Sequence, residues 1–246
     1  MSGPSGAPSP VLILARLAWT RLWRGRSIYV TAFLMLVPVA MAALERAFDR
    51  GPGRFAVVTE TGLRFLVTLA AAIHLSGAVG DEVEARTYTY LWSRPLSRRA
   101  LLFGKLLAVV PVLVAASAVS FTLAYLIVWG GEAGDHLGEL GRALLAAAAG
   151  NVAAAAFSVG AGALFPRHPL VFTLAVFLSA EQVLFLVPNA ASASILYHVR
   201  AVAGLPGPVD APGLVGALVG LAVLSAIWLA VGVWRVERAE YATVDR

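Results

Sequence analysis

Apolar positions form long, nearly uninterrupted runs along this chain, instead of the alternating or one-sided patterns of soluble domains. Short polar segments rich in arginine separate the runs. A helix that crosses a membrane needs about 20 predominantly apolar residues. The pattern therefore predicts an all-α integral membrane protein with six transmembrane helices, at about residues 27–44, 62–80, 101–129, 142–166, 169–188 and 211–234.

The residues before the first run divide into two parts. Residues 1–10 are small and proline-rich and contain no basic residue, which predicts a disordered tail and not a secretory signal. Residues 11–26 place polar and apolar side chains on opposite sides of a helix. Arginine and tryptophan at headgroup level are typical of a helix lying in the membrane interface, and here they are Arg16, Trp19, Trp23 and Arg24. The alternative is a ragged cytosolic end of the first membrane helix.

Composition limits what else the chain contains. Of its 246 residues, 59% are hydrophobic and 13% are charged, about half the charged fraction of soluble domains. Six crossings use about 120 residues, and the remaining residues, about 126, are needed for loops and chain ends. No large soluble domain fits beside them, so residues 11–246 are expected to form a single transmembrane domain. The chain has no cysteine, which excludes disulfides, thiol catalysis and cysteine-based metal sites.

The net charge of +5 informs topology and not nucleic-acid binding. Eighteen of the 19 basic residues are arginines, and they lie between the apolar runs. With six helices, 13 basic residues fall on the side of the two termini and 6 on the other side. Since basic residues favour the cytoplasmic side, both termini are predicted to be cytoplasmic. We expect no nucleic-acid partner.

Two polar sites lie within predicted membrane helices. An ionised Glu181, beside Gln182, would cost about 2.5 to 3.5 kcal/mol near the bilayer centre, so it must face protein or water, or be protonated. It is either part of a substrate or proton pathway, or a carboxylate that is hydrogen-bonded in the bundle or wet at the outer interface. His74 is a second pathway candidate, against the alternative of a neutral histidine buried beside a neighbouring helix.

Small residues recur at helix-packing intervals in the fourth and sixth predicted helices. We interpret them as packing positions within one bundle, in preference to a subunit or gating interface; they are Ala146, Gly150, Ala154, Ser158 and Gly162, and Gly216 with Gly220. The longest outer loop precedes the sixth helix, and residues 195–202 within it could form a short helix that dips into the interface.

The loop between the second and third predicted helices carries a distinctive pattern. Acidic residues come first, then Tyr88, Tyr90, Leu91 and Trp92, then Pro95 and a basic cluster. Acidic residues at the start and basic residues at the end suit the dipole of a short helix that ends before the proline. Such a helix at the cytoplasmic face would be a contact point for a partner, whereas a merely solvated loop would not explain the aromatic residues.

Catalytic signatures are missing from the sequence. Gly104 and Lys105 lack both the preceding glycine and the following serine or threonine of a phosphate-binding loop, and no metalloprotease or nucleophile-elbow motif is present. The chain therefore cannot bind and hydrolyse ATP by that route alone.

With this loop the chain resembles the ABC-2 type transporter permease family. The characteristic loop of that family matches at Glu82, Glu84, Thr87, Leu91, Pro95, Leu96, Ser97, Arg98, Gly104 and Lys105. Arg86 departs from the pattern, because the family usually has glycine there, so the local helix start can differ in shape.

The resemblance implies a membrane subunit without ATPase activity. It implies no directly bound cofactor, with Mg-ATP on a separate ABC ATPase subunit, and a second permease, either a copy or a sister chain. The family's coupling helix would contain Glu82, Glu84, Thr87, Tyr88, Leu91, Pro95 and Arg98, and residues 11–26 resemble its N-terminal connecting helix. Second and fifth helices often border the family's pathway, which here would include His74, Glu181 and Gln182.

The resulting expectation is an exporter permease in a bacterial inner membrane, working by alternating access. The alternative is an autonomous channel or a proton-coupled carrier that uses Glu181 and His74. A membrane enzyme is disfavoured by the missing motifs. Many Ala, Val, Leu and Phe residues along the predicted helices suit a lipid, drug or hydrophobic peptide without identifying the substrate.

Overall fold

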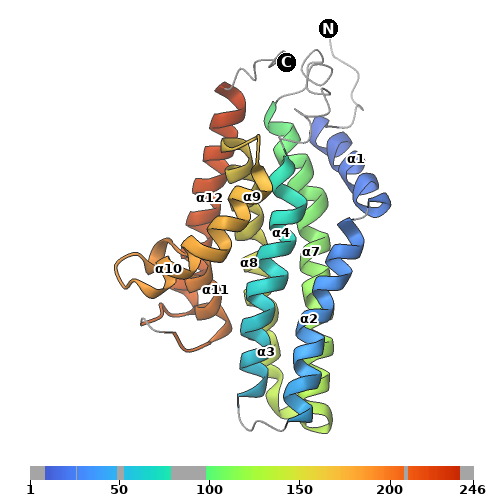
Figure 1. Cartoon of the computed structure of the whole chain (residues 1–246), viewed down its shortest axis with the longest axis vertical. Helices are drawn as coiled ribbons and strands as arrows, with labels where there is room; N and C mark the ends of the chain where they lie inside the picture. Colours follow the sequence, from blue (N-terminus) through green and yellow to red (C-terminus); the bar gives the residue numbers. More distant parts are fainter. Residues whose placement is uncertain (1–8, 26, 49–52, 79–97, 208–209, 239–246) are drawn as a thin grey trace.

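The fold is an elongated helical bundle whose longest helices run along one axis (Figure 1). The computed structural model describes residues 9–25, 27–48, 53–78, 98–207 and 210–238, and every regular element in these ranges is a helix. This agrees with the predicted all-α class. Residues 1–8, most of the predicted disordered tail, lie outside the described residues.

The chain enters the bundle through α1 (Pro10–Arg24) and α2 (Ser27–Ala47). The side chain of Ser9 accepts a hydrogen bond from the Leu12 amide, and proline occupies the first helical turn, where its missing N–H costs nothing. Leu14 and Leu22 are buried, whereas the four side chains assigned to the interfacial helix, Arg16, Trp19, Trp23 and Arg24, are exposed. The helix therefore buries one side, while its exposed side carries apolar residues such as Leu12 and Leu17 as well as arginine. Its location at a membrane interface stays a prediction.

The second long segment is interrupted by a π-helix and ends in a 3-10 turn. It consists of α3 (Arg54–Gly62), the π-helix η1 (Leu63–Val67), α4 (Thr68–Leu75) and the 3-10 turn η2 (Ser76–Ala78). It begins at Arg54 and not near residue 62. Glu60 and Arg64 form an ion pair across one helical turn at 2.9 Å. The helix therefore includes these charged residues, whereas the prediction relied on runs without charge and began the helix too late.

The middle of the chain forms a long helical hairpin. Helix α7 (Arg98–Trp129) runs to the end of the bundle distant from α1, the 3-10 turn η3 (Gly130–His136) reverses the chain, and α8 (Leu137–Leu164) returns (Figure 1). The last third comprises α9 (Pro169–Ala175), the π-helix η4 (Val176–Ala180), α10 (Glu181–Leu186), η5 (Ala191–Ala193), α11 (Ile195–Ala203) and α12 (Leu214–Arg238).

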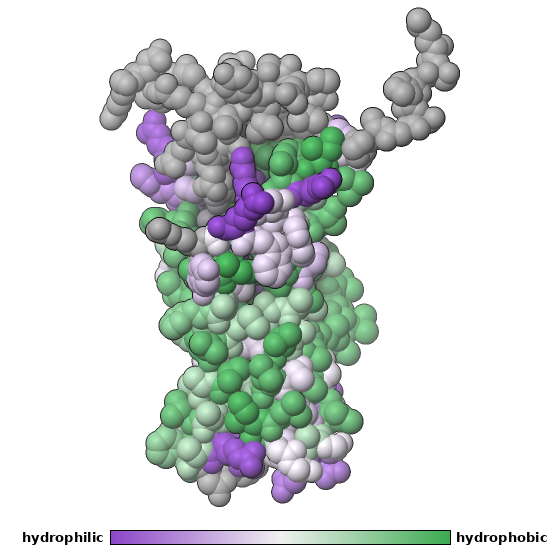
Figure 2. All heavy atoms as spheres, turned by 90° about the vertical axis from the view of Figure 1, so that its right-hand side faces the viewer, coloured by the Kyte–Doolittle hydropathy of each residue, from purple (hydrophilic) through white to green (hydrophobic). Residues whose placement is uncertain are grey.

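Five described segments are long and apolar enough to cross a membrane. They are Ile28–Ala47, Arg54–Ala78, Arg99–Leu164, Pro169–Leu186 and Leu214–Arg238. The third segment has 66 residues because it contains both arms of the hairpin. Figure 2 shows a broad apolar belt around one face, with hydrophilic side chains towards both ends, as expected for a bundle surrounded by lipid.

Helix α8 lies at the centre of the bundle, against α12, α7, α11 and α4. Its small side chains permit these close approaches: a Cβ at Gly150 would meet Val199 of α11 at 3.1 Å, and one at Gly160 would meet the Trp228 carbonyl of α12 at 2.5 Å. Ala146, Ala154, Ser158 and Gly162 are also buried within the chain. The structure therefore supports the prediction that this stripe packs inside one bundle.

Candidate functional site

A cavity of about 220 Å³ lies between the segment Arg54–Ala78, the segment Pro169–Leu186 and helix α11. The two π-helices face it together: η1 contributes Leu63, Arg64, Phe65 and Val67, and η4 contributes Phe177 and Leu178. Its remaining lining residues are Thr68, Glu181, Gln182, Ile195, Leu196 and Val199. Because π-helical turns frequently occur at functional sites, this convergence identifies the cavity as the candidate site.

Glu181 is buried at one wall of the cavity, with 5% of its surface exposed. Its carboxylate accepts hydrogen bonds from the Ser194 hydroxyl at 2.7 Å and from the amides of Ile195 and Leu196 at 3.3 and 3.1 Å. These amides are at the N-terminus of α11, where helix amides lack partners and the dipole favours negative charge. The structure thus supports the hydrogen-bonded alternative given for Glu181.

Helix α11 is defined at both ends by local chemistry. Ser194 accepts a bond from the Tyr197 amide as N-cap, and Gly204 ends the helix in the left-handed conformation, with φ of +72°. The amides of Gly204 and Leu205 bond to the carbonyls of Ala201 and Arg200, the paired pattern of a Schellman ending. The predicted short helix at 195–202 therefore exists with nearly the expected bounds, and it packs against α8.

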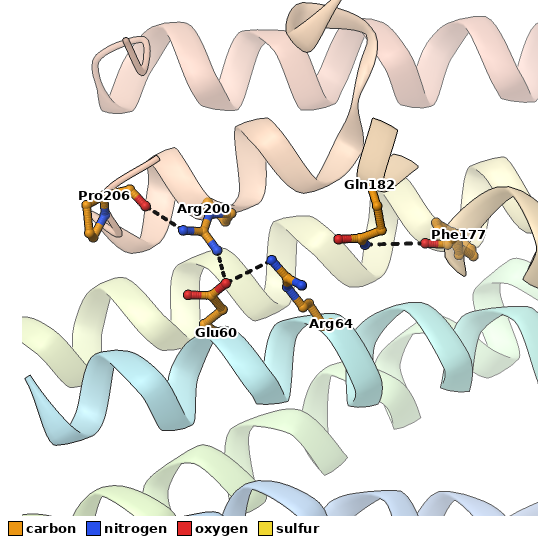
Figure 3. Close-up of polar contacts among 6 residues, drawn as sticks. All are labelled: Glu60, Arg64, Phe177, Gln182, Arg200 and Pro206. Atoms are coloured by element: carbon orange, nitrogen blue, oxygen red, sulfur yellow. Dashed lines mark hydrogen bonds and ion pairs between the residues drawn. The ribbon is translucent and has the colours of Figure 1, made fainter. Parts of the chain in front are cut away.

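Figure 3 shows a cluster of three charged side chains, Glu60, Arg64 and Arg200, of which Arg64 also lines the cavity. Glu60 of α3 pairs with Arg64 of η1 at 2.9 Å and with Arg200 of α11. Arg200 also donates to the Pro206 carbonyl, and its guanidinium lies 4.8 Å from the centre of the Phe185 ring. Arg200 therefore fastens α11 to α3 and α10.

Sequence reasoning did not select this cluster. It placed Arg64 at the start of the predicted helix 62–80, and it counted Arg64 and Arg200 on the outer side only as topology signals. The spacing of Glu60 and Arg64, four residues apart beside an apolar run, was the signal that could have placed both on a helix. The pairing with Arg200 depends on how α11 folds back, which local spacing does not encode.

The three predicted pathway residues do not all meet. Glu181 and Gln182 line the cavity, and the Gln182 amide donates to the Phe177 carbonyl at 3.5 Å. His74 is absent from the cavity lining, and its Nε2 is hydrogen-bonded with the Thr31 hydroxyl of α2. The structure therefore brings together two of the three candidates, and within the described ranges no group of acidic and histidine side chains forms a metal site.

Most of the predicted coupling residues belong to the part of the chain that the structure does not describe. Glu82, Glu84, Thr87, Tyr88, Leu91 and Pro95 fall outside the described residues, and Arg98 begins α7. The Lys105 ammonium donates to the Ala78 carbonyl at 2.9 Å, which joins the two helices that flank this loop. A Cβ at Gly104 would meet Leu14 Cβ at 2.8 Å, so this glycine admits α1 against α7.

Comparison with known families decides the classification. A family model described as ABC-2 family transporter protein matches residues 12–203, most of the chain. The chain belongs to this family. No curated protein matches it. In this ABC-2 family chain the match includes the cavity, the charged cluster and the loop between η2 and α7.

Membership of the ABC-2 family gives Gly104 and Lys105 a context. Both end the loop pattern on which the resemblance rested, and neither could be assigned a role from sequence. In the fold, one permits contact between α1 and α7 and the other ties α7 to the end of the second segment. The ABC-2 motif therefore ends in two residues that hold three helices together beside the loop.

Proposed function

We propose that the chain is the non-catalytic permease subunit of an ABC exporter in a bacterial inner membrane. Its family match over residues 12–203 carries this proposal. A separate ATPase subunit binds Mg-ATP, and a second permease, a copy or a sister chain, completes the pathway. The transporter alternates between two states that expose the pathway to opposite sides of the membrane. ATP shifts the equilibrium between them because the ATPase binds ATP more tightly in one state than in the other.

The topology proposed is six crossings with both termini in the cytoplasm. A helix of 66 residues would be about 99 Å long, three times the thickness of the hydrocarbon core, so the hairpin of α7 and α8 counts as two crossings. The C-terminal end of α12 lies beside the start of α7, where Glu237 pairs with Arg99 at 3.4 Å. The excess of arginine near this end supports its cytoplasmic placement.

Coupling to the ATPase is assigned to the loop that contains Glu82, Glu84, Thr87, Tyr88, Leu91, Pro95 and Arg98. Its flanking helices are tied by Lys105 and Ala78 and packed through Gly104 against α1. A displacement of the loop by the ATPase would therefore move the second segment, α7 and α1 together. This arrangement supports transmission of movement from the ATPase to the bundle.

The test is capture of an ATPase by the tagged full-length chain from its native membrane. Charge reversal at Glu82 and Glu84 should abolish co-purification of the ATPase and ATP hydrolysis in the captured complex. Reversal at Glu132 and Glu139, which lie at the opposite end of α7 and α8, should leave both intact. Unchanged association after reversal at Glu82 and Glu84 would remove the coupling role from this loop.

The second candidate function is a channel or proton-coupled carrier that uses Glu181 and His74. Both side chains lie in membrane-spanning segments, which keeps the alternative open, although each has a partner inside the bundle. A proton gradient imposed across vesicles containing the chain without an ATPase tests it. Proton flux that disappears with Glu181→Gln would establish the carrier, whereas equal flux in the variant would remove the carboxylate from consideration.

A further inference from the structure

The charged cluster beside the cavity contains more positive than negative charge. Glu60 supplies one carboxylate, and two guanidinium groups, those of Arg64 and Arg200, share its Oε1 atom (Figure 3). Within the described residues, the other carboxylate of the cavity is Glu181, and the donors of α11 and Ser194 already occupy it. Among the described residues no ion pair joins Glu181 to either guanidinium, so the cluster of Glu60, Arg64 and Arg200 holds one more positive than negative charge.

The surplus charge is best assigned to Arg64. Arg200 is 7% exposed and is held by Glu60, the Pro206 carbonyl and the Phe185 ring, as expected for a structural clamp. Arg64 has 35% of its side chain exposed, lines the cavity and pairs with Glu60 alone among the described residues. A guanidinium presents several N–H donors, so pairing with one carboxylate oxygen leaves Arg64 able to bind a second anion.

Apart from the polar groups, the cavity wall is apolar and continues onto the outer surface. Phe65 and Leu178 line the cavity and are 43% and 58% exposed, so hydrocarbon can extend from it along the lipid-facing side. Its volume, about 220 Å³, is below that of typical pockets for drug-sized ligands. The cavity thus suits a head group and the first part of a chain, with the remainder outside.

We propose that this cavity binds an anionic amphiphile as the transported substrate, with its acidic head group on Arg64 and its hydrocarbon chain passing Phe65 and Leu178. The role as substrate rests on the proposed permease function. Binding itself does not require the ATPase. Removing the hydrated head group from water is offset by a charge-assisted bond to a guanidinium that already lies at membrane depth.

Binding is measured on the full-length chain in nanodiscs of neutral phosphatidylcholine, so that the bilayer supplies no competing anionic lipid. Four radiolabelled probes separate charge from chain: dodecyl phosphate, dodecyltrimethylammonium, dodecanol and inorganic phosphate. Dodecyl phosphate should bind at least about tenfold more tightly than each of the others, the ratio that one charge-assisted hydrogen bond supports. Equal binding of the anionic and cationic amphiphiles, or of inorganic phosphate alone, would overturn the proposal.

Variants locate the site. Arg64→Gln should weaken dodecyl phosphate binding about tenfold, and Arg64→Lys should recover part of it because the charge remains. Leu178→Trp, at the mouth of the cavity, should weaken dodecyl phosphate more than inorganic phosphate. Arg46→Gln is the matched control. Arg46 does not line the cavity, and its guanidinium donates to the Ile127 carbonyl at 2.6 Å, so its replacement should leave binding unchanged. Equal binding by Arg64→Gln and the unaltered chain would refute the assignment.

The outcomes separate this inference from the proposed function. If an ATPase co-purifies but binding ignores head-group charge, the substrate class is wrong and the permease role stands. If dodecyl phosphate binds through Arg64 but no ATPase associates, the cavity is correctly assigned and its role as a transport site fails. Stimulation of ATP hydrolysis by dodecyl phosphate in the unaltered complex, reduced in Arg64→Gln, would support both.

Discussion

Two kinds of membrane segment differ sharply in this bundle. Three of the continuous helices, α7, α8 and α12, run without a π or 3-10 turn inside them and meet through alanine, glycine and serine. The interrupted segments, Arg54–Ala78 and Pro169–Leu186, each contain a π-helix and carry the charged side chains Glu60, Arg64 and Glu181. Both π-helices face one cavity, whereas the continuous helices provide the packed frame behind it.

The difference teaches where this chain tolerates imperfect helix geometry. A π-turn widens the helix and displaces its hydrogen-bond ladder, which is costly where neighbouring backbones must approach closely. It is acceptable where side chains line a cavity and polar groups have partners there. We therefore expect the frame to respond to added volume and the cavity side to respond to lost charge.

The largest effect is expected from added volume in the frame. A Cβ at Gly162 of α8 would fall well inside contact distance of the Ser76 carbonyl, a backbone group that has no flexible end to move. Gly162→Ala should lower the free energy of unfolding, measured by dodecyl sulfate titration in mixed micelles, by about 3 kcal/mol or more.

Gly141→Ala, on the same helix, is the control, because a Cβ there meets nothing within 4 Å. That variant should be neutral or more stable by up to about 1 kcal/mol. Equal stability of the two variants would contradict the close approach of α8 and η2.

On the cavity side, the largest effect is expected at Arg200. Arg200→Met keeps much of the volume but leaves the Pro206 carbonyl and one side of Glu60 without their charged donor. The free energy of unfolding should fall by about 2 kcal/mol. Hydrogen exchange should increase in α11 and not in α8, because Arg200 holds α11 locally.

Arg238→Met provides the comparison for Arg200. Arg238 lies at the C-terminal end of α12 with its guanidinium 5.5 Å from the Trp234 ring centre, and its loss should cost less than about 1 kcal/mol. A uniform rise in exchange across the bundle for Arg200→Met would argue against a local clamp.

The sequence was informative about the frame and less so about the cavity. Apolar runs predicted the membrane helices, and the stripe from Ala146 to Gly162 predicted the close packing of α8, because both depend on local composition. The early start of the second segment was missed, since Glu60 and Arg64 neutralise each other only once the helix exists. Neither π-helix has a sequence signature that we recognised.

The candidate site was predicted in part. Glu181 and Gln182 were selected because polar side chains within an apolar run are costly in a membrane unless they have a polar partner or contact water. The reason for Glu181, capping α11, required knowledge that the chain returns to it after residue 190. Arg64 and Arg200 were overlooked because topology counting treats every arginine alike, and His74 was grouped with Glu181 although it bonds to α2.

A smaller effect is expected at Glu181 itself. Glu181→Gln retains an acceptor but removes the charge that the α11 N-terminus stabilises, so stability should fall by about 1 kcal/mol. The first turn of α11 should exchange its amides faster. Gln182→Ala, one residue along, should change stability by less than about 0.5 kcal/mol, because its amide makes one long bond. Faster exchange of these amides in Gln182→Ala than in Glu181→Gln would contradict the assignment of Glu181 as the acceptor that stabilises the first turn of α11.

The smallest effect tests whether polar bonds, as well as packing, join the continuous helices. Asn151 of α8 is fully buried and donates to the Ser117 hydroxyl of α7 at 2.9 Å, and it also donates to the Ala147 carbonyl of its own helix. A double-mutant cycle of Asn151→Ala and Ser117→Ala should give a coupling of about 0.6 kcal/mol, as for interhelical bonds in other membrane bundles.

Ser158 and Ser225 provide the control cycle, since each hydroxyl donates to a carbonyl four residues earlier in its own helix, at 2.7 and 2.6 Å. Their coupling should be near zero although α8 and α12 are closely packed. Equal coupling in both cycles would mean that truncation of small side chains, and not the bond between Asn151 and Ser117, accounts for the measured energy. The continuous helices would then be joined by packing alone, which would widen their difference from the charge-bearing segments at the cavity.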